Sequence, residues 1–403
     1  MPKMFTLAAA VTALAFATTA RAQITVDGQL TAAEVSATGY SLVGRDTGPR
    51  GFSPSATDEA GLLALYAGAD ATNLYFFLVA TLQNNGTPAT ISNSLQLFVA
   101  RPGVAGVPVG TRLPKPAVAT APAVNTSFQN FGPFLEQPGD MAVGIKGNGA
   151  AAQFQVDGVV YSGGATPTAS AAVLSGATGV AANGTVAAVS GQTGTFTVFN
   201  GAQVAYRTAA NLNANPGYGT NGAGAVPAIG LEISVSRASI GLPAAGGTIQ
   251  VFALQNNQDG GFASSDFIPQ NTGALPASFS NAPNLGTDPD FRLVPGTQSA
   301  SITVGAATGV TVLSSRKEVA SAFRFSAYPN PSDGTFQVGY TVPGAPQELQ
   351  VEVYSTIGRR VRTLASSRQA GTQQYTVGGL AAGTYIVRLQ AGSQSTSQLV
   401  IVK

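Results

Sequence analysis

The side chains of this chain that could do chemistry are its carboxylates, hydroxyls and amines, because its 403 residues include neither His nor Cys. Without an imidazole there is no Ser-His triad and no ordinary zinc site, and without a thiol there is neither a cysteine nucleophile nor a disulfide. Paired carboxylates remain, as in glycoside hydrolases, where they lie about 5 to 9.5 Å apart across a cleft. The candidates for such a pair are Glu34, Asp58, Glu59, Glu136, Asp140 and Glu232.

The spacing of these acidic residues along the chain does not show whether any two of them face each other across a cleft. Glu232 alternates with apolar residues in the run GLEISV, which predicts that its side chain lies on the exposed face of a strand. Acidic residues in loops are usually solvated. We therefore expect no enzymatic activity, and keep a carboxylate-based glycoside hydrolase as the less favoured alternative.

Calcium is the metal that the sequence allows, because its ligands are carboxylate and carbonyl oxygens. Asp27, Asp70, Asp259 and Asp266 all lie in turns rich in Asn and Gly. The best candidate loop is QNNQDGGFASSD at 255–266, although it lacks the spacing of an EF-hand. Asp259 and Asp266 are therefore calcium candidates, and the alternative that each Asp stabilises its own turn stays open. No other cofactor is expected.

The first residues have the three parts of an export signal. Lys3 supplies the positive charge, residues 4–18 form an apolar run, and Ala20-Arg21-Ala22 is a cleavage site of the A-x-A kind. We therefore expect residues 1–22 to be a signal peptide and the mature protein to lie outside the cytoplasm. No later stretch has the roughly 20 apolar residues that span a bilayer, so we expect no transmembrane segment.

The region that must position the candidate residues, 23–304, reads as a large antiparallel β-sandwich. The run LYFFLV at 74–79 predicts a strand buried on both faces, whereas Leu95, Leu97 and Val99 alternate with polar neighbours and predict a half-buried strand. Residues 163–194 are of low complexity and read either as a long loop or as weakly specified strands. The fold class expected for the whole chain is all-β.

The charge changes sign near residue 315. Residues 23–315 carry 9 basic and 14 acidic side chains, and residues 316–403 carry 9 basic and 4 acidic ones. Because this contrast coincides with a change in composition, we predict a linker at 305–322 and a second domain at 323–403. Alternating runs and turn signals, such as Pro343-Gly344, predict six or seven short strands there, in a small Ig-like β-sandwich.

The stretch YPNPSDGTF at 328–336 begins this tail. Its two prolines fix φ and its Asp-Gly pair predicts a tight turn into the next strand. With VEVYSTIGRRV at 351–361, GLAAGTYIVRL at 379–389 and the terminal strand, it resembles the type A C-terminal sorting domain of the type IX secretion system of Bacteroidota. The residues taken as the sorting motif are Pro329, Asn330, Pro331, Gly334, Gly358, Gly383 and Lys403.

The resemblance implies that the secretion machinery recognises the tail at the outer membrane. It further implies that a sortase removes the tail and that the cargo is released or attached to surface lipopolysaccharide. The expected location is therefore extracellular, free or on the outer-membrane surface.

The first domain, with ITVDGQLTAAE at 24–34, LYAGADATNLYFFLVATL at 65–82 and GLEISVSRASIG at 230–241, is similar to family 9 carbohydrate-binding modules and DOMON-like domains. This similarity implies a glycan ligand, although the chain has no Trp to stack on a sugar ring. A purely structural or adhesive surface protein is the alternative. Nucleic acid is not an expected partner, because the domain is acidic and shows no basic, aromatic-interleaved stripe.

Overall fold

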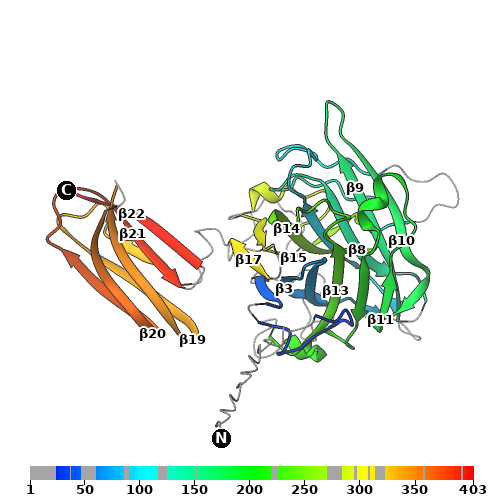
Figure 1. Cartoon of the computed structure of the whole chain (residues 1–403), viewed down its shortest axis with the longest axis horizontal. Helices are drawn as coiled ribbons and strands as arrows, with labels where there is room; N and C mark the ends of the chain where they lie inside the picture. The colour runs from blue at the N-terminus through cyan, green and yellow to red at the C-terminus, as the bar shows by residue number, and fades with distance from the viewer. Residues whose placement is uncertain are drawn as a thin grey trace, which may run out of the picture.

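The computed structural model of the chain is all-β, as predicted, and consists of a large first unit and a smaller C-terminal unit (Figure 1). The structure describes residues 24–36, 38–46, 60–85, 90–116, 125–150, 152–218, 225–269, 284–294, 297–306, 309–313, 323–356, 359–391 and 394–403. The predicted signal peptide lies outside these residues. No helix among them is long and apolar enough to cross a membrane.

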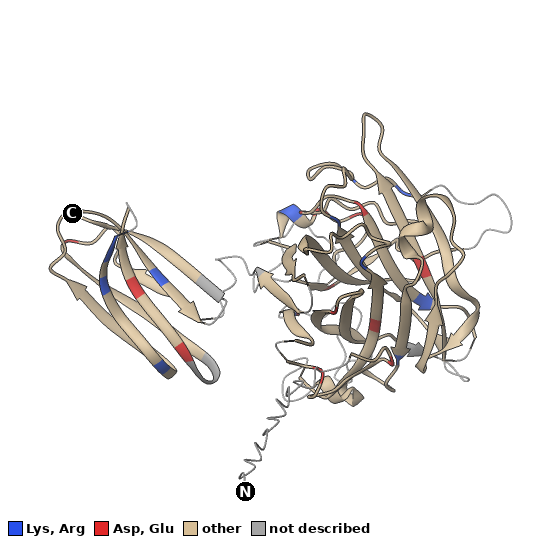
Figure 2. Cartoon of the chain, in the orientation of Figure 1, with Lys and Arg blue, Asp and Glu red and all other residues tan. Residues whose placement is uncertain are grey.

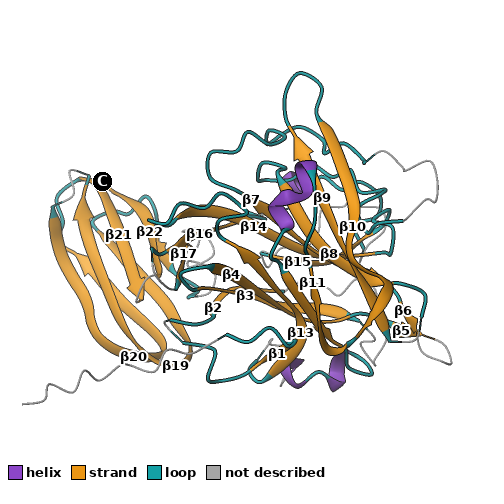
Figure 3. Ribbon diagram, turned by 45° about the vertical axis from the view of Figure 1, so that its right-hand side comes forward, coloured by secondary structure: helices purple, strands orange, loops and turns teal. Residues whose placement is uncertain are grey.

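The first unit contains two antiparallel sheets that face each other (Figure 3). The seven-stranded sheet has the order β11 (Asn183–Ala188), β12 (Gln203–Arg207), β13 (Ala228–Ser236), β4 (Asn73–Thr81), β3 (Gly61–Ala69), β2 (Ser41–Arg45), with β1 (Gln29–Leu30) paired to β13. The eight-stranded sheet has the order β10 (Thr168–Ala181), β9 (Gln153–Ser162), β8 (Met141–Gly147), β7 (Ser94–Ala100), β14 (Gly247–Asn256), β16 (Ala300–Val304), β17 (Val310–Leu313), with β15 (Ala263–Ile268) paired to β14.

The remaining elements of the first unit are short. They are the strand pair β5 (Asn84–Asn85) and β6 (Thr90–Ile91) and the 3₁₀ turns η1 (Gly194–Phe199), η2 (Leu212–Ala214), η3 (Pro216–Tyr218) and η4 (Phe291–Leu293).

The main core of the first unit lies between the two sheets. It is built by alternate side chains of each strand, such as Phe76 and Ile233 from one sheet and Leu97 and Val143 from the other. Period-two alternation places every second side chain on the same face of a strand, so these residues all point inward. The run LYFFLV is buried along its whole length in β4, as predicted.

The outer faces of both sheets are also covered, and this differs from the sequence expectation. The outer face of the eight-stranded sheet packs against loops that we call the loop layer, residues 101–116, 125–140 and 284–294. Phe128 and Phe291 of this layer form a second core with Phe98 and Phe252 of the sheet. The strand predicted to be half-buried, β7, is therefore buried on both sides, polar neighbours included.

Residues 168–181 and 183–188, in the segment that read either as a long loop or as weakly specified strands, form strands β10 and β11, and β10 pairs with β9 through two register shifts. One prediction about a segment needs correction. β17 lies inside the predicted linker 305–322, because Val310 and Val312 pair with Val304 and Ile302 of β16 and so extend the sheet. The first unit therefore continues to Leu313.

The C-terminal unit is a single five-stranded antiparallel sheet that curls around its own core. Its strands are β18 (Ser326–Tyr328), β19 (Thr335–Ser355), β20 (Arg360–Gly378), β21 (Gly383–Ala391) and β22 (Gln394–Val402). β19 pairs with β20 along nearly its whole length, with β18 near its start and with β21 near its end.

The prediction of six or seven short strands in this unit was wrong. β19 runs for 21 residues through Pro343 and Gly344, where the sequence predicted a turn. Val338, Val351, Val387 and Val400 all enter the same core, so the curled sheet encloses one hydrophobic interior in the manner of a small sandwich.

Candidate functional site

The sorting motif of the tail lies against the terminal strand β22. The Ser332 backbone N–H donates to the Ile401 carbonyl at 2.8 Å, and the Lys403 N–H donates to the Ser332 carbonyl at 2.9 Å. Ser332 thereby forms a parallel bridge with Val402. The motif and the end of the chain, far apart in sequence, form one surface in the folded tail.

Asn330 closes the same edge with its side chain. Its amide nitrogen donates to the Leu399 carbonyl at 2.6 Å, and its amide oxygen accepts the Ile401 N–H at 2.9 Å. The Gln398 side chain makes the reverse contact, accepting from the Ala327 N–H at 2.7 Å and donating to the Ala327 carbonyl at 3.1 Å. Because β21 occupies the other edge of β22, these contacts pair backbone groups that would otherwise form an open strand edge.

The other motif residues have definite places in this arrangement. Pro329 and Pro331 flank Asn330 and donate no backbone hydrogen bond, so pairing in this segment rests on Asn330 and Ser332. Gly334 has φ +89°, a left-handed value that glycine adopts without steric cost, and nothing lies within 4 Å of a Cβ built there. The backbone conformation, not crowding, therefore explains this glycine.

Gly383 opens β21 and is paired with Val402, the residue that bridges Ser332 on its other side. Lys403 lies 3.6 Å from Asp333, but both side chains are well exposed, so this ion pair adds little stability. The structure thus brings together all the predicted motif residues that it describes. Gly358 lies outside the described residues.

Three large apolar side chains near this edge are exposed. Tyr328 is 52% exposed, Leu399 51% and Ile401 42%. Exposed apolar groups beside a sealed strand edge provide contact area for another protein without exposing backbone for uncontrolled strand pairing.

Among the acidic candidates of the first unit, Glu232 contradicts its predicted exposure. It lies on the outer face of β13, as the alternation requires, but its side chain is completely buried beneath the N-terminal segment. Its carboxylate accepts hydrogen bonds from the Tyr40 hydroxyl at 2.7 Å and from the Asp27 and Gly28 N–H groups, both at 2.9 Å. Burial raises the pKa of Glu232 to about 7, aided by nearby Glu34 and opposed by these hydrogen bonds.

The other described candidates for a hydrolase pair are also held by structural contacts. Glu34 accepts from the Thr31 N–H and hydroxyl at 2.9 and 2.8 Å, and Asp140 forms a two-pronged ion pair with Arg101. Glu136 accepts a hydrogen bond from the Gln298 N–H. Asp58 and Glu59 lie outside the described residues. The four described carboxylates thus stabilise loops and termini.

A carboxylate that sequence reasoning missed, Asp157, is buried under the loop layer. It accepts from the Ser127 N–H and the Gln155 side chain, both at 2.7 Å. Burial raises its pKa to about 6, although these hydrogen bonds and nearby Lys146 act in the opposite direction. Its signal in the sequence was weak, because one Asp in the run VDGVV gives no hint that loops cover that face.

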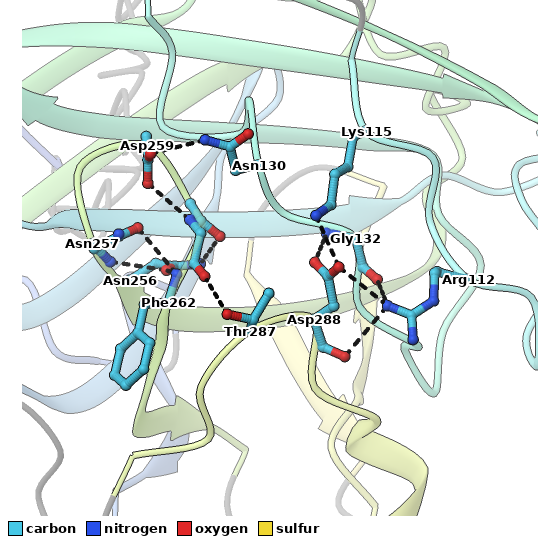
Figure 4. Close-up of polar contacts among 12 residues, drawn as sticks. Arg112, Lys115, Asn130, Gly132, Asn256, Asn257, Asp259, Phe262, Thr287 and Asp288 are labelled. Carbon is cyan, nitrogen blue, oxygen red and sulfur yellow. Dashed lines mark hydrogen bonds and ion pairs between the residues drawn. The ribbon is translucent and has the colours of Figure 1, made fainter. Parts of the chain in front are cut away.

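Most of the calcium candidates serve their own turns. Asp259 accepts from the Gly261 N–H at 2.9 Å and from the Asn130 side chain at 2.8 Å (Figure 4). Asp27 and Asp70 accept from groups two to five residues along the chain. Asp266 is buried within β15. The described residues contain no group of three or more acidic side chains suited to a metal ion.

The loop layer holds a cluster of charged side chains that the sequence did not indicate, which we call the cationic cluster: Arg112, Lys115 and Arg292 around Phe134, with Asp288 and Asp290. Isolated bridges pair Arg112 with Phe134 and Phe134 with Asp290. The guanidinium carbons of Arg112 and Arg292 lie 4.8 and 4.3 Å from the centroid of the Phe134 ring. Three sequence segments therefore meet at one aromatic ring.

Comparison with known proteins identifies the tail. Residues 326–403 match the family described as "Secretion system C-terminal sorting domain". The predicted resemblance of the tail is confirmed, and with it export to the cell surface or the extracellular space. The similarity of the first unit to carbohydrate-binding modules stays a prediction.

No curated protein matches the chain. A solved structure described as "Biofilm associated protein - BSP domain" has 7% sequence identity and a TM-score of 0.17, covering 87% of this chain and 53% of its own length. The chain thus spans about half of that structure, and at this TM-score the likeness supports no statement about fold or function.

Proposed function

Because residues 326–403 are a C-terminal sorting domain of the type IX secretion system, we propose that this protein is a non-enzymatic cargo of that system whose first domain binds glycan at the cell surface or in the medium. One observation carries the export part: the sorting motif is hydrogen-bonded to the terminal strand β22, so that the two form one surface. Removal of the tail by a sortase and attachment to surface lipopolysaccharide belong to the same proposal.

The non-enzymatic part is supported by the use of the carboxylates. Glu34, Asp140 and Glu232 are all less than 8% exposed, and each accepts hydrogen bonds from the protein itself. A glycosidase needs two carboxyl groups open to one cleft, with one free to donate a proton to the substrate. Side chains committed to internal contacts are poorly suited to that role.

The glycan part is supported by the loop layer. This layer presents amide, carboxylate and guanidinium groups held by internal contacts, among them Asn130, Asp288 and Arg112 (Figure 4). Directed polar groups of this kind suit the hydroxyls of a sugar. The large exposed apolar side chains described in the first unit are Leu and Val, so a flat aromatic platform is not part of the proposal. A purely structural or adhesive role is the alternative.

Two experiments test the parts separately. Deleting residues 323–403 should leave the protein in the periplasm, and normal secretion after the deletion would refute the export assignment. For the first domain, the full chain is applied to a glycan array with and without calcium. Binding supports the glycan proposal, whereas complete lack of binding under both conditions favours the structural alternative.

Hydrolysis is tested on the same preparation. Polysaccharides that bind the protein on the array should release no reducing ends when they are incubated with it. Cleavage that is lost in Glu232→Gln or Asp140→Asn would overturn the non-enzymatic part.

A further inference from the structure

The exposed positive charge of the first unit is concentrated in one place. Of its basic side chains that the structure describes, Arg112, Lys115 and Arg292 are exposed, whereas the other five are buried or half-buried. Those five are Arg45, Arg101, Lys146, Arg207 and Arg237. Figure 2 shows how sparse charged residues are over the unit as a whole. In a domain that carries more acidic than basic residues, this gathering of exposed cations needs an explanation.

We propose that the cationic cluster binds acidic polysaccharide, with Arg112, Lys115 and Arg292 contacting carboxylate or sulfate groups. This proposal rests on the glycan-binding part of the proposed function and names the chemical class of the ligand. Three cations against two carboxylates, Asp288 and Asp290, leave the cluster with one net positive charge.

Phe134 and Asp288, around which the cations gather, are held in place by backbone contacts. The guanidinium groups of Arg112 and Arg292 both lie over the Phe134 ring, and the Phe134 backbone is hydrogen-bonded to Pro289 and Phe291 at 3.0 Å each. Asp288 is held at φ +46°, a left-handed value that Asp tolerates, and accepts the Gly132 N–H at 2.8 Å. Side chains that are already ordered lose less conformational entropy on binding, which favours affinity.

Within the cluster the carboxylate oxygens accept hydrogen bonds from the protein itself, whereas some nitrogen donors are left for a ligand. Asp288 binds Gly132 with one oxygen and Lys115 with the other, at 2.8 Å each (Figure 4). Both oxygens of Asp290 bind Arg292. By contrast, every side-chain hydrogen bond and ion pair that Arg112 makes with the described residues uses Nη1, so among these residues Nε and Nη2 are donors left for a ligand.

A guanidinium edge with two free donors matches a carboxylate or sulfate, which accept two parallel hydrogen bonds. Lys115 has one ion-pair partner for its three donors. Two other acids that contact the first unit's loops are also engaged, Asp259 with Asn130 and Glu136 with the Gln298 N–H. The cluster therefore offers directed positive donors to an anionic group.

The experiment measures binding of the full chain to polygalacturonate, dextran sulfate and uncharged dextran over a range of NaCl concentrations. The variant Arg112→Gln/Lys115→Gln/Arg292→Gln removes three exposed cations from the cluster. Arg359→Gln/Arg368→Gln/Arg388→Gln removes three exposed cations from the tail and changes the net charge equally. A thermal unfolding scan checks that both variants fold.

We expect binding to at least one acidic polysaccharide that weakens with salt, because a polyanion releases counterions when it is bound. The cluster variant should bind at least tenfold more weakly than the tail variant. The two acidic polymers distinguish carboxylate from sulfate ligands. Arg112→Lys should recover only part of the affinity, because lysine keeps the charge but loses the fork and the ring stacking.

Four results would overturn the proposal. Equal loss in the cluster and tail variants would mean that only net charge matters. Binding to uncharged dextran that is insensitive to the cluster would leave glycan binding standing and remove its anionic specificity. Binding to a DNA duplex but to neither acidic polysaccharide would assign the cluster to another class of polyanion. Failure to bind any glycan would refute the glycan proposal as well, whereas export is judged by the tail deletion.

Discussion

Stability of the first unit should fall as the pH rises, because Glu232 is buried with a raised pKa. The ordinary pKa of this carboxyl is 4.5 and the folded value is about 7. In the unfolded chain the group ionises from about pH 4.5 upward, while in the folded protein it stays protonated until about pH 7. Its contribution is therefore fully present below pH 4.5 and is lost as the pH rises through 7.

The size of the effect follows from the two pKa values. The two pKa values differ by about 2.5, and one pKa unit corresponds to about 1.4 kcal/mol. The protonated carboxyl therefore adds about 3 kcal/mol to the free energy of unfolding. Most of this loss, roughly 2.5 kcal/mol, falls between pH 5 and pH 8. Glu232→Gln keeps the size of the side chain and one acceptor oxygen for the Asp27 and Gly28 N–H groups, and it cannot ionise. The variant should therefore lose this part of the pH dependence.

The assay is urea unfolding followed by far-UV circular dichroism at pH 5, 6, 7 and 8, with the free energy of unfolding compared between wild type and Glu232→Gln. Asp70→Asn is the matched control, because Asp70 is a partly exposed turn carboxylate whose pKa is lowered by hydrogen bonds despite partial burial. It should leave the slope between pH 5 and 8 unchanged. Equal pH dependence in wild type and Glu232→Gln would refute the assignment of the effect to this carboxyl.

Three further predictions concern other parts of the molecule. Asp157→Asn should remove a second pH-dependent part of the stability of the first unit, which lies at lower pH because the folded pKa of Asp157 is about 6. The same urea unfolding series at pH 4 to 6 measures it. Asn330→Ala should cost about 1 kcal/mol and speed hydrogen exchange of the Ile401 amide, which loses its acceptor; an unchanged exchange rate would contradict the edge-closing role. Phe291→Ala should destabilise the first unit by about 3 to 5 kcal/mol, because its ring lies 4.7 Å from that of Phe252, and calorimetry should show the tail transition unaffected.

The sequence predicted the all-β class and the main core because period two is a local property. Phe76, Leu97 and Ile233 are inward-facing in the structure, as alternation requires. Alternation also put Glu232 on the opposite face from Ile233 correctly. It does not say whether that face is open to solvent, and here the N-terminal segment covers it through a contact between Asp27 and Glu232, 205 residues apart.

The loop layer escaped prediction for a related reason. Its residues have no regular period, and its hydrophobic side chains are interrupted by polar, Gly and Pro residues, as in FQNFGPFL at 128–135. Arg112 and Arg292 are single cations in unrelated loops, and only the bridges through Phe134 bring them together. A site assembled from such loops leaves no spacing in the sequence to detect.

The tail shows the opposite case, in which several sequence motifs identified the sorting domain although the predicted strand pattern was partly wrong. Asn330 and Ile401 are 71 residues apart, and they meet only when β19, β21 and β22 have paired in register. A peptide containing YPNPSDGTF alone therefore lacks half of the surface that the motif forms. The order of several motifs along the tail was more informative than any one of them, because the physical site needs all the strands that those motifs build.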